Sequence, residues 1–395
     1  MLEDAATKHM PLDWLRQNAP VFRDTSSGCF FLTRYADVRH LLTERHLKNS
    51  DLAEKGSFLD KAGRPVNPKR PHERDASMGY LDDPDHERIR RPIAQAFAKR
   101  FSICRPTVER IVAAHLDALA TETVFDLVSA YSIPVPLKAN ALMIGVDEPD
   151  LDKFRDWTLD GFKMFQTERT DAETTAMNDA HEGFASYFER LIGERRGQPR
   201  EDLVSDLLAA QASGVPITDQ EIRSNCVSLI AASIMTTTDL ISSTVWLLLH
   251  HPEELARLKD DPKLIGSAVE EALRVAPPVE SEWRIMSRDL EIAGCPVHQG
   301  QVVAVSLLAA NRDPSVFSDP HRFDISREQR PHVSFGGGEH ICIGAPLGRL
   351  EAQLAVGAFF TRFPGATLAA PEALPKRRPT PYFPGLAELA IAVQR

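Results

Sequence analysis

A glycine-rich loop with one cysteine constrains this chain more than any other part of its sequence. Residues 335–344 read Phe-Gly-Gly-Gly-Glu-His-Ile-Cys-Ile-Gly, and an amphipathic stretch at 345–363 follows at once. The spacing of that stretch predicts a helix. Backbone amides around the sulfur of Cys342 and a helix N-terminus behind it both favour a thiolate. The loop therefore predicts a cysteine with a chemical role, although a lone buried cysteine is more often a small apolar side chain.

Two other interpretations fit the residues of this loop less well. A nucleotide loop would end in G-K-[ST] or lie in a strand–helix–strand unit with a downstream acid, and neither pattern is present. His340 and Cys342 could begin a zinc site, but no second Cys/His pair follows at a suitable spacing. The chain also carries no flavin motif. We therefore expect no bound NAD(P), ATP, flavin or zinc.

Composition narrows the class of protein further. The chain has 395 residues and a formal net charge of −10, which argues against nucleic acid as the main partner. Its five cysteines are scattered and odd in number, which argues against a disulfide framework and fits a reducing cytoplasm. Residues 1–20 contain no apolar signal segment, and no uncharged apolar run approaches the roughly 20 residues that span a bilayer. We expect a cytoplasmic protein with no membrane association.

Apolar periodicity predicts many helices and a few short strands. A capping box, Thr218-Asp-Gln-Glu221, opens the longest helix, which continues to His250 before Pro252 stops it. At 1.5 Å per residue this helix is about 48 Å long, and its apolar centre at 227–235 should be buried. The other expected elements are a hairpin at 21–31, helices at 35–47, 151–165 and 172–196, a long loop at 55–80, and strands at 290–292, 302–306 and 387–393.

Four motifs in one order resemble the cytochrome P-450 family. Phe335, Gly338, Cys342 and Gly344 match its F-x-x-G-x-x-x-C-x-G signature. Residues 83–90 resemble its haem-facing helix, 271–274 its E-x-x-R motif, and 311–323 its meander before the haem loop. The resemblance runs from about Leu12 to the C-terminus. It implies one mainly α domain over 1–395, with small β-sheets near the N-terminus and after residue 283 (α+β). Haem b would lie between the long central helix and the helix after the cysteine loop.

The resemblance also assigns roles around this haem. Cys342 would be the axial iron ligand, and the loop glycines would let the backbone pass close to the porphyrin. Four residues match positions that hold the haem propionates, unless they are solvated surface charges: His86, Arg90, Arg284 and His340. Glu271 and Arg274 would form a buried charge network with Arg322 behind the cysteine loop.

Residues 232–237 align with the family's A-G-x-[D/E]-T-T segment over the haem, but they depart from it. Thr236 falls on the oxygen-binding threonine, whose hydroxyl would help to deliver protons, unless it simply bonds back to its own helix. Met235 stands where the family has an acid, and Ser233 where it has glycine. Asp239 lies three residues after Thr236 on nearly the same helix face, so we hypothesise that it replaces the missing carboxylate. Otherwise water alone delivers protons, or the reaction is atypical.

The remaining expectations concern substrate and partners. Candidate substrate contacts are Ala231, Ala232, Val279, Glu280, Phe383 and residues of the 64–80 loop. Glu280 and Glu282 could bind a cationic or hydroxylated substrate or merely face solvent. A basic cluster at Arg88, Arg91, Lys99 and Arg100 could dock an acidic ferredoxin, or be a solvated helix face.

The resemblance implies a haem-thiolate monooxygenase that inserts one oxygen atom from O2 into a small organic substrate. Electrons would come from a separate ferredoxin and ferredoxin reductase. Two other functions stay open. One is peroxide-driven, coupling or rearrangement chemistry on the same haem, which Met235 favours. The other is a haem sensor without turnover.

Overall fold

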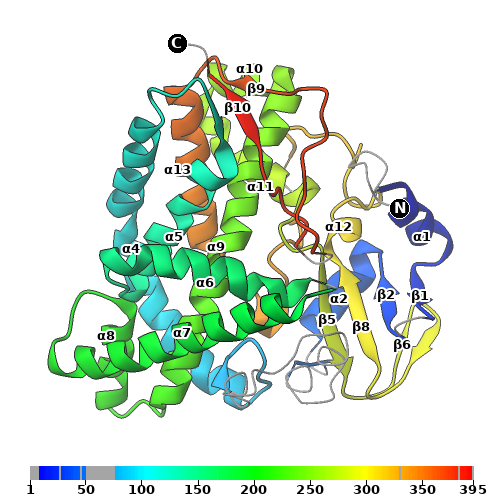
Figure 1. Ribbon diagram of the computed structural model, residues 1–395. Coiled ribbons are helices and arrows are strands. Elements are labelled where there is room, and N and C mark those ends of the chain that lie inside the picture. Colours follow the sequence, from blue (N-terminus) through cyan, green and yellow to red (C-terminus); the bar gives the residue numbers. More distant parts are fainter. Residues whose placement is uncertain are drawn as a thin grey trace.

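Helices form most of the molecule, and its largest sheet lies at one side (Figure 1). The computed structural model describes residues 9–25, 28–44, 47–49, 76–166, 168–328, 331–380 and 383–393. The helices are α1 (His9–Asn18), α2 (Tyr35–Thr43), α4 (Asp85–Ala118), α5 (Pro134–Ile144), α6 (Leu151–Phe162), α7 (Asp171–Gly197), α8 (Leu203–Ala212), α9 (Asp219–His250), α10 (Pro252–Asp260), α11 (Ile265–Val275), α12 (Leu307–Ala310) and α13 (Ala345–Arg362). The predicted mainly α fold with small β-sheets is confirmed.

The long helix predicted from its capping box is α9, and its start is as expected. Thr218 accepts from the backbone of Glu221, and the Glu221 side chain accepts from the backbone of Thr218. α9 packs against α5, α7, α11 and α13 at the centre of the molecule. The prediction that its middle is buried all round is wrong for one face. Ile230 and Ile234 are buried in the core, but Ala232 is exposed, because this face of the helix lines a cavity.

Three small sheets join segments far apart in the sequence. The largest has the order β1 (Val21–Arg23), β2 (Phe30–Leu32), β8 (Val302–Ser306), β5 (Ser281–Met286) and β3 (Leu47–Lys48). Within it β2 and β8 are parallel and the other pairs are antiparallel. The other sheets have the orders β4 (Val124–Asp126), β10 (Ala390–Ala392), β9 (Thr367–Leu368), and β6 (Leu290–Ile292), β7 (Cys295–Val297).

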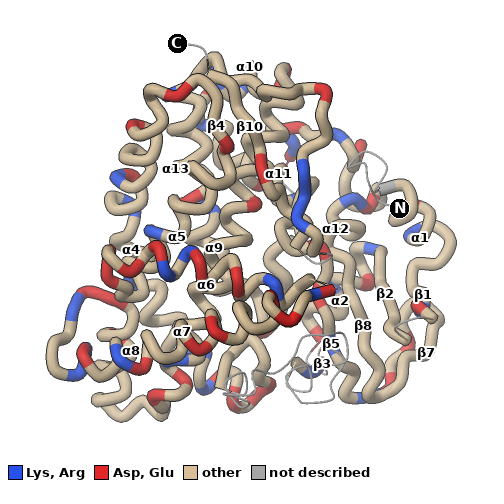
Figure 2. The backbone as a smooth tube through the Cα atoms, viewed as in Figure 1, with Lys and Arg blue, Asp and Glu red and all other residues tan. Residues whose placement is uncertain are grey.

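Most of the predicted elements are present with shifted ends. The hairpin at 21–31 and the strands at 290–292 and 302–306 are confirmed, and the last strand is shortened to β10. α2 ends at Thr43 because the next residue is extended, and α6 ends at Phe162 before a 3-10 turn. Residues 55–75 of the predicted long loop lie outside the described residues. Acidic and basic side chains are interspersed along α6, α7 and α8 (Figure 2).

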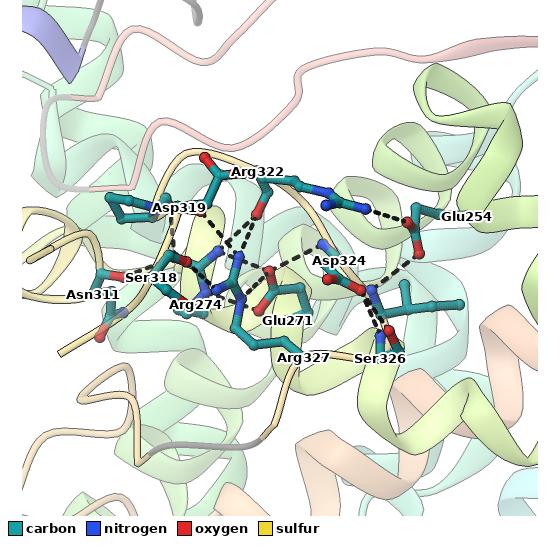
Figure 3. A network of polar contacts seen from close by, with 12 residues as sticks. Glu254, Glu271, Arg274, Asn311, Ser318, Asp319, Arg322, Asp324, Ser326 and Arg327 are labelled. Atoms are coloured by element: carbon teal, nitrogen blue, oxygen red, sulfur yellow. Dashed lines mark hydrogen bonds and ion pairs between the residues drawn. The ribbon is translucent and has the colours of Figure 1, made fainter.

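A buried charge network ties α11 to the segment that follows α12 (Figure 3). Arg274 donates to both carboxylate oxygens of Glu271, at 2.7 and 2.8 Å. The prediction that Arg322 supplies the next guanidinium is wrong. Arg327 donates to Glu271 at 3.0 Å, whereas Arg322 contributes only its backbone carbonyl to the network and points its side chain toward Glu254. The turns of this segment decide which arginine reaches Glu271.

A second ion pair joins α11 to α13 and to the start of the cysteine loop. Glu270 accepts from Arg349 at 2.6 and 2.9 Å and lies 3.1 Å from His332. Burial alone raises the pKa of Glu270, but hydrogen bonds from His332 and Arg349 outweigh burial and lower it to about 2. The folded state therefore prefers the ionised carboxylate.

This pair predicts how stability depends on pH. A folded-state pKa near 2 stabilises the fold by up to about 3 kcal/mol above pH 4.5, and this stabilisation is lost as the pH falls toward 2. Glu270→Gln should therefore lower the free energy of unfolding by about 2–3 kcal/mol at pH 7 and by progressively less below pH 4.5, measured by urea unfolding. The control is Glu109→Gln in the exposed pair with Arg105, which should change it by less than about 1 kcal/mol. A difference for Glu270→Gln that does not change with pH would contradict this account.

Candidate active site

A cavity of about 660 Å³ lies between the middle of α9 and the cysteine loop. Thr236 lines it from α9, and Cys342 lines it from the loop. Its walls also include aromatic and methionine side chains from α5, from the end of α6 with its 3-10 turn, and from the C-terminal segment: Met143, Phe162, Met164, Phe165 and Phe383. The cavity thus brings together one thiol, a few polar groups and a mostly apolar wall, which is typical of a cofactor and substrate site.

The cysteine loop is closed by its own backbone and points its sulfur into the cavity. The amide of Cys342 donates to the carbonyl of Phe335 at 2.9 Å, and α13 begins three residues after the cysteine. Burial raises the pKa of the Cys342 thiol, although the amides of Gly344 and Ala345 hydrogen-bond to the sulfur and partly offset this. The expected stabilisation of the thiolate by the loop amides is present, but burial outweighs it. A metal cation bound to the sulfur would stabilise the thiolate against this effect of burial.

The loop glycines are needed where the loop packs on neighbouring segments. A β-carbon on Gly338, whose φ is +63°, would lie 2.5 Å from the carbonyl oxygen of Leu42 at the end of α2. On Gly336 it would lie 2.9 Å from a carboxylate oxygen of Glu282. Gly344 has more room, since its β-carbon would be 3.8 Å from the Cys342 sulfur. Close packing against α2 is thus one reason for glycine at 338, beside the expected approach to a flat ligand.

Three of the four predicted propionate contacts line the cavity, and the fourth lies beside one of them. Arg90, Arg284 and His340 line it, and the ring of His86 lies 4.2 Å from that of His340. His86 is 2% exposed, and its Nε2 has no hydrogen-bond partner among the described residues. Burial lowers the pKa of His340 to about 3, so this imidazole is neutral at ordinary pH. The unpaired Nε2 of His86 and the neutral and cationic N–H donors beside it fit the two carboxylates of a haem.

One acid lies among these donors. Glu282 lines the cavity and accepts from Arg284 at 2.7 Å, so part of that guanidinium is already engaged. Glu280 does not line the cavity in the described part of the chain. Burial lowers the pKa of Arg312 and Arg377, and the charge of Glu280 partly offsets this. The other predicted substrate contacts, Ala231, Ala232, Val279 and Phe383, all line the cavity.

The α9 wall differs from the arrangement expected for proton delivery. The Thr236 hydroxyl donates to the carbonyl of Ala232 at 2.7 Å, which is the back-bonded geometry considered above. Met235 is 2% exposed and packs in the core. Asp239 is 1% exposed, is not among the cavity-lining residues, and accepts from Arg378 at 2.5 Å. The structure thus brings Thr236, but not Asp239, to the cavity.

Sequence analysis missed a buried acid that borders the cavity from another helix. Glu351 on α13 is fully buried, yet it borders the cavity beside Thr237. Asn140 of α5 donates to it at 2.9 Å. Burial raises the pKa of Glu351 well above its usual value, and hydrogen bonds from Asn140 and Thr237 offset this only in part, so burial favours the protonated carboxyl. The signal was its place on the apolar face of the helix, four residues from Leu347 and from Ala355.

The basic cluster predicted to dock a ferredoxin is largely neutralised within the chain. Arg88 pairs with Glu221 at 2.6 Å. Lys99 and Arg100 both pair with Asp206, at 2.7 and 2.5 Å, and Arg100 is 6% exposed. These contacts fasten α4 to α8 and α9, whereas Arg91 is exposed.

Comparisons with known proteins agree with this geometry. The family model "Cytochrome P450" matches residues 158–377. "Biotin biosynthesis cytochrome P450" of Bacillus subtilis (strain 168) is 36% identical over 324 residues, covering 82% of this chain and 81% of that protein. "6-deoxyerythronolide B hydroxylase" of Saccharopolyspora erythraea is 33% identical over 380 residues, covering 92% of each.

A solved structure shares the whole fold. P450BioI, in complex with an acyl carrier protein ligated with hexadec-9Z-enoic acid, superposes with a TM-score of 0.90 at 32% sequence identity, covering 99% of each chain. The level of identity and the coverage of these relatives establish the family. The chain belongs to the cytochrome P450 family and is a P450 monooxygenase.

Proposed function

We propose that this P450 binds haem b through Cys342 and inserts one oxygen atom from O2 into an apolar organic substrate. Electrons would come from a separate ferredoxin and its reductase. The observation that carries the proposal is that Cys342 and Thr236 line one cavity from opposite elements, and that three of the four expected propionate contacts line the same cavity, with the fourth beside His340. When bound, the haem supplies the activation of dioxygen; the chain's residues bind and orient it and supply protons.

The substrate class follows from the cavity wall. Phe162, Phe165 and Phe383 meet there with ring centroids 4.5 to 5.4 Å apart, and Met143 and Met164 line the cavity beside them. Such a wall favours an apolar ligand with few directional polar contacts. The names of the relatives, a hydroxylase of 6-deoxyerythronolide B and a protein bound to a hexadecenoyl carrier protein, suggest large carbon skeletons. We propose a lipid-like or macrolactone-like substrate.

Because Met235 replaces the acid of the family and carries no proton to deliver, proton delivery needs a carboxyl elsewhere, and two candidates remain. Asp239 stays a hypothesis, although its pairing with Arg378 and its absence from the cavity lining disfavour it. Glu351 has a pKa raised by burial, borders the cavity and contacts Thr237, the neighbour of Thr236. We therefore assign the proton to a carboxyl oxygen of Glu351, from which Thr237 and water would carry it toward Thr236.

An alternative function has one observation in its favour. Since Met235 is buried in the core and Asp239 is ion-paired, no ionised carboxylate beside Thr236 lines the described cavity wall from α9. This arrangement is compatible with peroxide-driven, coupling or rearrangement chemistry on the same haem. Product formed with ferredoxin, reductase, NADPH and O2, and not only with added peroxide, would decide for the monooxygenase.

The sulfur ligand predicts a spectroscopic result. Reduced protein reconstituted with haem and exposed to carbon monoxide should give the red-shifted Soret band of a thiolate-ligated adduct, and Cys342→Ser should abolish that band. Cys295→Ser is the matched control and should keep it, because Cys295 lies in β7, outside the cavity lining. A red-shifted band that survives in Cys342→Ser would contradict the ligand assignment.

The proton assignment predicts a contrast between two variants. Glu351→Gln keeps the size and the hydrogen bond to Asn140 but removes the transferable proton. We expect product formed per electron to fall by about 100-fold, the lower end of the range for loss of a general acid, whereas Asp239→Asn should not change how this ratio depends on pH. The measurement is the ratio of product to NADPH consumed, as a function of pH. Loss of coupling in Asp239→Asn with none in Glu351→Gln would reverse the assignment.

A further inference from the structure

A buried ion pair connects the middle of α9 to the segment between β9 and β10. This segment descends from the edge of the molecule toward the end of α6 (Figure 1). The Asp239 carboxylate accepts from Arg378 Nη2 at 2.5 Å, and the two side chains are 2% and 15% exposed. The pair therefore joins two elements that are about 140 residues apart in the sequence.

The same guanidinium organises the segment around itself. Arg378 Nη2 also donates to the carbonyl of Phe383 at 3.2 Å, and Nη1 donates to the carbonyl of Leu386 at 3.3 Å. The Arg378 amide donates to the carbonyl of Gly385 at 2.9 Å. Thr380 adds a second bond to the Phe383 carbonyl, at 2.6 Å. The backbone at Phe383 is thus fixed by an arginine that is itself anchored on α9.

The turn approaches this pair so closely that its backbone has no room for a side chain at one position. A β-carbon on Gly385 would lie 1.9 Å from Asp239 Oδ1 and 2.4 Å from Arg378 Nη2. Both distances are shorter than any van der Waals contact. The distance between this turn and α9 is therefore set by direct contact of Gly385 with the ion pair.

Phe383 connects the turn held by the ion pair to the cavity. Its side chain lines the cavity and packs on Phe162 and Phe165, with ring centroids 5.4 and 4.5 Å away. Neither Asp239 nor Arg378 is among the cavity-lining residues. A change at the pair would reach a ligand through Phe383.

Burying the Asp239–Arg378 pair has a free-energy cost, because its charges and polar atoms lose their contacts with water. Asp239 Oδ1 and Arg378 Nε are buried without hydrogen-bond partners among the described residues. Burial raises the pKa of Asp239 to about 6, although Arg378 and Arg377 oppose this. A buried ion pair with unsatisfied atoms often stabilises a fold less than apolar residues of the same volume. Its best-attested benefit is a fixed geometry, which here is the position of Phe383.

We propose that Asp239 and Arg378 are positioning residues that hold Phe383 against the bound substrate and so set substrate selectivity. The inference rests on the proposed haem site, because ligand binding in that cavity is its consequence. It gives Asp239 a role in place of proton delivery.

Two azole ligands test this without knowledge of the substrate. Imidazole is small enough to occupy the iron without reaching the far wall, whereas clotrimazole is bulky. The quantity measured is the ratio of their spectral Kd values in the haem-loaded protein. Phe383→Ala, Asp239→Asn and Arg378→Lys should each change this ratio by about fivefold or more in the same direction, the size of coupling between contacting residues. Arg378→Lys keeps the charge but loses the fork that also holds the Phe383 carbonyl.

The double variant Asp239→Asn with Phe383→Ala should change the ratio no further than Phe383→Ala alone, because both act through one side chain. The matched control is Asp202→Asn in the buried pair with Arg195, at 2.6 Å and away from the cavity, which should leave the ratio within about twofold. Hydrogen exchange at the amides of Arg378 and Ala387 should become faster in Asp239→Asn, a readout that does not need haem.

The outcomes separate the two proposals. If imidazole gives no spectral change in the wild-type protein, the haem proposal fails. If imidazole binds but Asp239→Asn leaves both the ratio and the hydrogen exchange unchanged, the positioning role is wrong. Additive effects in the double variant, or an equal effect of Asp202→Asn, would likewise overturn it.

Discussion

The position of the Cys342 sulfur depends on the contacts that hold the loop of residues 335–344 in place. Its backbone bond from Cys342 to Phe335 closes the loop, and Gly338 lets it press on the end of α2. Glu270 on α11 holds Arg349 on α13 and His332 before the loop, so both flanks are tied to the same helix. Because α2, α11 and α13 all contribute, the core of the molecule, rather than the loop alone, points Cys342 into the cavity.

Three buried acids show how the environment decides what a carboxyl can do. Glu271 contacts Arg274 and Arg327 and serves the fold. Asp239 has one guanidinium, whose other bonds hold a turn of the backbone. Glu351 has neutral partners, Asn140 and Thr237, and burial favours its protonated form. The same functional group is thus a structural anion, a positioning anion and a neutral acid, according to the charges that face it.

Local patterns in the sequence predicted much of the fold. The capping box of α9, the hairpin near the N-terminus and the cysteine loop before α13 each depend on residues close together in the chain. Motif order predicted four propionate contacts, of which Arg90, Arg284 and His340 line the cavity and His86 lies against His340; their contact with a propionate stays a prediction. The predictions that failed depended on contacts between distant segments, which spacing does not specify.

Three residues illustrate this limit. A guanidinium was expected beside Glu271, but whether Arg322 or Arg327 reaches it depends on turns that periodicity does not describe. Asp239 is three residues from Thr236, which leaves about 60° between them around the helix, enough to face another segment. For Cys342 the amides could be counted from the sequence, whereas the opposing burial could not.

The most direct test of the account is iron K-edge X-ray absorption on the haem-loaded protein. The account predicts one sulfur scatterer in the first shell of the iron in the wild type, and its replacement by a lighter atom in Cys342→Ser. A first shell made only of nitrogen and oxygen in the wild-type protein would contradict it.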